Sequence, residues 1–247
     1  MERQKRFFAD NLGGDMVELS TAESHHALHV LRLTSGETVE LFDGRGNLAD
    51  GEIAKARRGK VSVRVAGRRR AADRPRPQVH LAFAAAKGKR LDWLLAKATE
   101  LGAASLTPVH FERSVVKPAD LAGTKRERWR GQCVAAAKQS HLNWLPEIRG
   151  PLALGAYLQN FDSARGVGLA GSVSPQAAPV RDALDAASAG SAGEVHVLVG
   201  PEGGMTDAEY AAAEAAGFVP VRLGYATLRI ETACVALIAA VVAVVGP

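Results

Sequence analysis

The stretch that decides the fold is Glu194-Val195-His196-Val197-Leu198-Val199, followed at once by Gly200-Pro201-Glu202-Gly203-Gly204. A short valine-rich run bounded by glycine and proline is typical of a buried strand in a parallel sheet. Thr206 and Glu209 form a capping-box pattern, which predicts a helix that ends at Gly217. Ligands of open α/β sheets bind beyond the carboxyl ends of strands. The glycine-rich turn is therefore a candidate ligand site, with an ordinary strand-to-helix turn as the alternative.

A second turn of the same kind lies near the end of the chain. It reads Leu223-Gly224-Tyr225-Ala226-Thr227-Leu228-Arg229 and leads into Glu231-Thr232-Ala233. Glu231 suits the first turn of a helix, where a carboxylate meets the positive end of the helix dipole, although Arg229 and Glu231 could also pair with each other. Two glycine-bearing turns at strand ends predict one shared pocket.

Strands and helices alternate from Val79 onward. Strands are expected at 79–83, 106–111, 167–169, 194–199 and 219–223, with helices at 91–101, 126–141, 206–217 and from about 231. This alternation favours an α/β fold in which helices cover both faces of a parallel sheet. The uncharged run 233–245 is shorter than the ~20 residues of a membrane-spanning helix, so it is expected to be a core helix.

The first seventy residues are predicted to form a small β-barrel. Residues 37–42 and 61–65 alternate with a period of two, 43–47 is a turn, and 23–33 is the one helical candidate. Residues 68–77 are rich in arginine and proline, which is typical of a linker. We therefore expect two domains, residues 1–74 and 75–247.

Composition limits the class of protein. The chain has 247 residues, 47% of them hydrophobic and 23% charged, so it is globular rather than disordered. Its two cysteines, Cys133 and Cys234, exclude a disulfide scaffold and a zinc site built from cysteine pairs, and are expected to be buried and reduced. No metal site is expected, because His25, His26 and His29 fit surface or capping positions. No apolar run follows the basic N-terminal residues, so no secretory signal is expected and the protein is predicted to be soluble and cytoplasmic.

The net charge of +5 permits a polyanionic partner. Basic residues crowd three stretches, 57–76, 87–90 and 117–130. The competing interpretation is solvated surface charge. One other pattern, Gly166-Val167-Gly168-Leu169-Ala170-Gly171, matches the dinucleotide-binding spacing. No convincing strand precedes it and Ser174-Pro175 follows, so a flexible loop at a strand end is the favoured interpretation.

Several motifs together resemble a known family. They are Gly200-Pro201-Glu202-Gly203-Gly204, Leu228-Arg229 with Glu231-Thr232-Ala233, Lys87-Gly88-Lys89-Arg90-Leu91-Asp92-Trp93-Leu94, Lys97-Ala98-Thr99-Glu100-Leu101-Gly102 and the opening Arg6-Phe7-Phe8. The chain resembles the ribosomal small subunit methyltransferase E family of the SPOUT class of RNA methyltransferases. The resemblance extends over nearly the whole sequence.

The resemblance implies a PUA-like N-terminal β-barrel, a SPOUT α/β domain with a trefoil knot, and a homodimer. It further implies S-adenosylmethionine as cofactor and methylation of N3 of a uridine in 16S ribosomal RNA. The implied cofactor-binding residues are Leu169, Ala170, Leu198, Val199, Gly200, Pro201, Glu202, Gly203, Gly204, Leu223, Gly224, Thr227, Leu228 and Arg229. The residues expected to hold RNA are Arg6, Arg32, Lys87, Lys89 and Arg90.

The expected chemistry is in-line displacement at the sulfonium methyl group. Uridine N3 must lose its proton, so the protein must supply a base or stabilise the uridine anion. Arg229 is the candidate for stabilising negative charge, and Glu231 or Glu202 for accepting the proton. The alternatives are a SPOUT methyltransferase acting on another RNA or on a ribose 2′-hydroxyl, and a non-catalytic RNA-binding protein of the same fold.

The chain departs from the family pattern at three positions. Ala226 and Thr227 stand where the family usually has arginine and isoleucine, and Leu142 stands where it often has arginine. Loss of these arginines would alter RNA affinity or target choice more than the pocket, because main-chain contacts survive a change of side chain.

Overall fold

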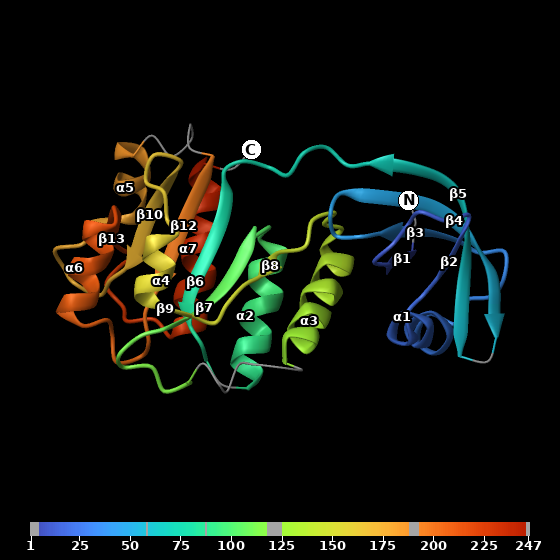
Figure 1. The fold of residues 1–247 in the computed structure, drawn as a ribbon, viewed down its shortest axis with the longest axis horizontal. Coiled ribbons are helices and arrows are strands. Elements are labelled where there is room, and N and C mark those ends of the chain that lie inside the picture. Colours follow the sequence, from blue (N-terminus) through green and yellow to red (C-terminus); the bar gives the residue numbers. More distant parts are fainter. Residues whose placement is uncertain (1–4, 58, 87, 118–124, 188–192, 246–247) are drawn as a thin grey trace. The chain divides into compact units, whose positions relative to one another are not determined.

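The computed structural model describes residues 5–57, 59–86, 88–117, 125–187 and 193–245. Contacts within the chain group it into two units (Figure 1). The first consists of Met1–Arg74 with Ala137–Leu145, and the second of Pro75–Ala136 with Pro146–Pro247. The sequence prediction did not place residues 137–145 with the N-terminal unit.

The first unit is built on a five-stranded sheet of order β1-β3-β4-β5-β2. Its strands are β1 (Lys5–Phe8), β2 (Met16–Glu18), β3 (Thr38–Phe42), β4 (Asn47–Arg57) and β5 (Lys60–Arg70). Helix α1 (Thr21–His25) continues as the π-helical segment η1 (His26–Val30). Apolar side chains from the strands and from η1 form one core, with Phe7, Leu41 and Val63 fully buried. The predicted strands around a single helical segment are confirmed.

The second unit contains an eight-stranded sheet whose strand pairs are all parallel. The strand order is β11-β13-β10-β12-β6-β7-β8, and β9 also pairs with β7. The strands are β6 (Gln78–Ala84), β7 (Ser105–His110), β8 (Glu147–Ile148), β9 (Leu152–Ala153), β10 (Gly166–Gly171), β11 (Ala178–Pro179), β12 (Glu194–Val199) and β13 (Phe218–Arg222). The prediction of a parallel sheet is therefore confirmed.

Helices cover both faces of this sheet (Figure 1). They are α2 (Lys89–Glu100), α4 (Leu154–Gln159), α5 (Val180–Ala186), α6 (Asp207–Ala215) and α7 (Ile230–Val245). Residues of helix α3 (Lys125–Ser140) are divided between the two units. The apolar helix α7 packs on β6 and β12, with α2 and α5 against it, whereas α6 packs on β13 and against α4. The predicted capping box is present, because the Thr206 hydroxyl accepts from Glu209 N and the Glu209 carboxylate accepts from Thr206 N.

None of the helices in the described part of the chain combines the length and apolar character that crossing a bilayer requires. The trefoil knot stays a prediction.

The glycine pattern at 166–171 forms the inner strand β10, between β12 and β13. The strand expected at 167–169 is therefore confirmed, and the interpretation of the whole pattern as a flexible loop is wrong. Gly168 lies opposite Phe218, and a Cβ atom at Gly168 would come within 2.8 Å of the Phe218 ring. The glycine spacing therefore reflects close packing of an aromatic side chain inside the sheet.

We expect Gly168→Ala to lower the free energy of unfolding by about 1–3 kcal/mol, because the added methyl group overpacks the Phe218 ring. Gly155→Ala is the matched control: Gly155 lies in α4 with open space around its Cα, so alanine should stabilise by up to about 1 kcal/mol. Urea denaturation followed by circular dichroism measures both. Equal stability of Gly168→Ala and the native protein would contradict this packing argument.

Both cysteines are free and buried, with Cys133 1% and Cys234 0% exposed. Burial raises the pKa of Cys133 to about 11. Burial and the negative charge of Glu231 raise the pKa of Cys234. Neither thiol should therefore react with a chromogenic disulfide reagent at pH 8 in the folded protein, and both should react in denaturant. Stoichiometric labelling of the folded protein would show that one of them is accessible.

Candidate active site

A pocket of about 280 Å³ lies beyond the carboxyl ends of β10, β12 and β13, three neighbouring parallel strands. Gly171, Val199 and Val221, at or next to the ends of these strands, line it. The first glycine-bearing turn contributes Gly200, Pro201, Glu202, Gly203 and Gly204, and the second contributes Leu223, Gly224, Tyr225, Ala226, Thr227 and Leu228. The two turns meet in a single pocket, as their positions in the sequence predicted.

The first turn is held by hydrogen bonds on both sides. Gly204 has a φ of +72°, a left-handed conformation that favours glycine, and its N–H donates to Pro201 O at 2.8 Å. From outside the turn, Arg113 Nη1 donates to Gly203 O at 2.9 Å. The sequence analysis missed Arg113, since its position beside this turn arises only from the tertiary fold.

Helix α7 adds an apolar part to the pocket wall. Ile230, Ala233 and Leu237 of α7 supply it, and Tyr210 of α6 lies nearby with its hydroxyl donating to Gly171 O at 3.1 Å. Tyr225 lies at the rim and is fully exposed. Backbone groups of the turns and an apolar wall suit a flat ligand with polar edges.

Ten of the predicted cofactor-binding residues line the pocket: Val199, Gly200, Pro201, Glu202, Gly203, Gly204, Leu223, Gly224, Thr227 and Leu228. Leu169, Ala170 and Leu198 do not, because each is at most 1% exposed and packs inside the sheet. Strand β10 continues to Gly171, so Gly171 and Ser172 take the place predicted for Leu169 and Ala170. Arg229 is also outside the lining.

The three catalytic candidates occupy different environments. Glu202 lines the pocket, half exposed, with its Oε1 3.4 Å from Arg90 Nη1. Arg229 is exposed and has no hydrogen bond or ion pair from its side chain to the described residues. Glu231 lies in the first turn of α7, 8% exposed and outside the lining, and its Oε2 has no hydrogen-bond partner among the described residues. Of the two carboxylates predicted to accept the proton, Glu202 is the one that lines the pocket.

One of the predicted RNA-binding residues is placed differently from expectation. The side chain of Arg6 is only 3% exposed, with Nε 2.9 Å from Glu40 Oε1 and the guanidinium 4.1 Å from the centre of the Phe42 ring. Burial lowers the pKa of Arg6. This arginine is engaged inside the N-terminal unit in this structure, and its role in holding RNA stays a prediction.

Arg32 and Lys89 are exposed, as contact with RNA requires, and Arg90 is exposed beside Glu202. Lys87 lies outside the described residues. The arginines at the end of β5 are partly engaged within the unit. Arg68 donates to Leu12 O and Gly14 O, and Arg69 pairs with Glu40 and Asp50.

The chain is similar to known RNA methyltransferases. An RNA methyltransferase domain family matches residues 73–242, and an RNA methyltransferase PUA domain family matches residues 19–66. The ribosomal RNA small subunit methyltransferase E of Synechocystis sp. is 33% identical over 217 residues, covering 88% of this chain and 69% of that relative. The protein of the same name from Mycobacterium bovis is 34% identical over 241 residues, covering 95% of this chain and 90% of the relative.

A solved structure extends the likeness to three dimensions. The ribosomal RNA small subunit methyltransferase E of Neisseria gonorrhoeae, crystallised with S-adenosylmethionine, superposes with a TM-score of 0.85 at 29% identity and covers 99% of each chain. The predicted SPOUT α/β domain and PUA-like N-terminal domain are confirmed. The chain belongs to the ribosomal RNA small subunit methyltransferase E family of RNA methyltransferases.

Proposed function

We propose that this protein transfers the methyl group of S-adenosylmethionine to N3 of a uridine in 16S ribosomal RNA. The observation that carries the proposal is the single pocket that both glycine-bearing turns form at the carboxyl ends of β10, β12 and β13. A member of the same family has been solved with S-adenosylmethionine, which supports that compound as the occupant.

The pocket suits the chemical character of this ligand. Backbone N–H and C=O groups of the turns can recognise the edge of an adenine, while Ile230 and Leu237 offer an apolar surface to its ring. Glu202 is the one carboxylate among the lining residues. A carboxylate would repel a phosphate but is compatible with a sulfonium cation or ribose hydroxyls, so a nucleoside sulfonium fits better than a nucleotide phosphate.

S-adenosylmethionine supplies an electrophilic methyl group on a positively charged sulfur. The chain must orient uridine N3 toward that group and remove the N3 proton. We propose that Glu202, the catalytic candidate that lines the pocket, accepts the N3 proton. We propose that Arg229 stabilises the negative charge on a uracil oxygen. Within the described part of the chain no side chain competes for the Arg229 guanidinium, and its neighbours Leu228 and Ile230 both line the pocket.

Residues outside the pocket would hold the RNA. We propose that Arg32 and Lys89 contact backbone phosphates, and that the exposed ring of Tyr225 stacks on a base at the pocket rim. We further propose that residues 1–74 act as a PUA-like RNA-binding domain and residues 75–247 as the methyltransferase domain. We also propose that the protein assembles as a homodimer, as the family resemblance implies, and that it is cytoplasmic, as the sequence analysis predicted.

Calorimetry and product mapping test this function in sequence. We expect S-adenosylmethionine to bind with a micromolar Kd, roughly −8 kcal/mol, and mass spectrometry of treated small-subunit RNA to locate one N3-methyluridine. Absence of binding would favour a non-catalytic RNA-binding protein. Binding with methylation at another RNA or at a ribose 2′-hydroxyl would correct the proposed target.

We expect Arg229→Ala to bind S-adenosylmethionine within about threefold of the native protein and to lose about 10²–10³-fold in kcat, the usual effect of removing a charge-stabilising donor. Arg181→Ala is the matched control, because Arg181 is exposed on α5 and outside the pocket lining. Single-turnover methylation of small-subunit RNA measures both. Native turnover by Arg229→Ala would remove the role assigned to Arg229.

A further inference from the structure

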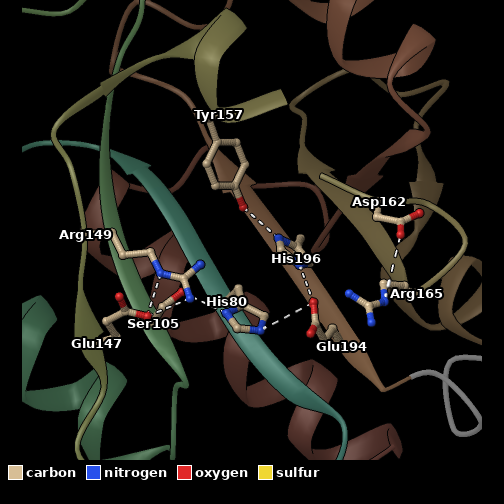
Figure 2. A network of polar contacts seen from close by, with 9 residues as sticks. All are labelled: His80, Ser105, Glu147, Arg149, Tyr157, Asp162, Arg165, Glu194 and His196. Atoms are coloured by element: carbon tan, nitrogen blue, oxygen red, sulfur yellow. Dashed lines mark hydrogen bonds and ion pairs between the residues drawn. The ribbon is translucent and has the colours of Figure 1, made fainter. Parts of the chain in front are cut away.

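A network of polar side chains lies near the amino-terminal ends of strands of the parallel sheet, and two buried histidines are at its centre (Figure 2). Glu194 and His196 are near the start of β12, whose last residue, Val199, lines the pocket. His80 of β6 pairs in register with His196. The two imidazoles are 7% and 8% exposed, and their rings stack with centroids 4.6 Å apart.

Both imidazoles turn the same ring nitrogen toward one carboxylate. Glu194 Oε2 lies 3.2 Å from His196 Nε2 and 3.8 Å from His80 Nε2, and potential ligand atoms of the three residues all lie within 4.8 Å of one another. Tetrahedral zinc with bonds of about 2.1 Å separates its ligands by about 3.4 Å. The separation of Glu194 and His196 is already close to that value. The Glu194 side chain is 43% exposed, which leaves it room to move toward His80.

Hydroxyl groups anchor the far nitrogen of each ring. Ser105 Oγ lies 2.8 Å from His80 Nδ1, and Tyr157 Oη lies 3.0 Å from His196 Nδ1 (Figure 2). A hydroxyl can accept a hydrogen bond from Nδ1–H, and in that tautomer Nε2 carries the lone pair that a metal needs. Such a partner on the second ring nitrogen is the usual companion of a metal-binding histidine, since it fixes both the tautomer and the ring orientation.

The charges around the cluster are compatible with a dication. Glu194 contributes one negative charge at the point where both Nε2 atoms converge. The nearby arginines have carboxylates of their own: Arg149 lies 2.6 Å from Glu147, and Arg165 lies 4.0 Å from Asp162.

We propose that His80, Glu194 and His196 form a binding site for one zinc-class divalent cation, with water completing a four-coordinate shell. Two imidazole nitrogens and one carboxylate oxygen are a donor set that zinc accepts and that magnesium does not favour. The ion would join β6 to β12 and stabilise the sheet at the end away from the pocket. The sequence predicted no metal site, because local spacing could not bring His80 to the pair on β12.

The test uses the full chain after removal of metals with a chelator. We expect calorimetric titration to show one Zn²⁺ bound per chain, an increase in Tm with Zn²⁺, and no comparable effect of Mg²⁺. Protein loaded with Co²⁺ should show the visible absorption of a four-coordinate site. Binding of S-adenosylmethionine, measured on the same samples, should be unchanged by the metal.

Single substitutions test which side chains bind the Zn²⁺ ion. Glu194→Gln keeps the shape of a half-exposed side chain and should weaken Zn²⁺ binding at least tenfold and abolish the cobalt absorption. Tyr157→Phe should weaken binding about tenfold, the usual effect of losing such a partner. Glu147→Gln removes a carboxylate that pairs with Arg149 in the same network and should bind Zn²⁺ normally.

A second control addresses the other candidate zinc ligands. His25 and His29 lie in the N-terminal unit with ring centroids 4.7 Å apart, so they could bind Zn²⁺ adventitiously. His25→Gln combined with His29→Gln should retain the single site. The proposal fails if the native protein binds no more Zn²⁺ than Glu194→Gln, or if the bound ion is lost with His25 and His29. Either outcome would leave a hydrogen-bonded histidine pair without a metal.

Discussion

The parallel pairing of β13, β10 and β12 is the constraint on which the rest of this structure depends. Because all three strands run in the same direction, their carboxyl ends reach one edge of the sheet, and the turns that follow β12 and β13 must leave from that edge. Helix α7 packs on β12 and β6 and supplies an apolar part of the pocket wall. The pocket is thus a consequence of strand direction and helix packing.

The same pairing creates a row of neighbouring residues across the amino-terminal end of the sheet, away from the pocket. In register, Ser105, His80, His196, Gly168 and Phe218 follow one another from β7 to β13. The missing side chain at Gly168 makes room for the Phe218 ring, and the hydroxyl of Ser105 lies against His80 at the other end of the row. The amino-terminal end of the sheet therefore carries polar and aromatic side chains, whereas the carboxyl end carries the glycine-rich turns of the pocket.

Local patterns predicted those parts of the fold that local physics determines. The run from Glu194 to Val199 and the capping box at Thr206 each carry enough signal within a few residues, and both occur as predicted. The remaining features depend on which strands pair with one another. The sequence predicted only a short strand at 167–169, because the partners that extend β10 lie on other strands. Pairing of Gly168 with Phe218 and of Gly171 with Val221 lengthens β10, and the pocket wall shifts from Ala170 to Gly171.

The positions of charged side chains also depended on contacts that the sequence does not show. The sequence shows Arg6 as one of several basic residues, but the fold buries it against Glu40 and Phe42. The supporting arginine Arg113 and the grouping of His80 with Glu194 had no local signal at all, since each depends on a contact between distant segments.

Hydrogen exchange with and without S-adenosylmethionine tests the central claim most directly, which is that the two turns form one binding pocket. We predict that the ligand slows exchange in peptides covering 199–205 and in those covering 223–230 at the same ligand concentration. Protection of only one of these segments, or of neither, would contradict the account.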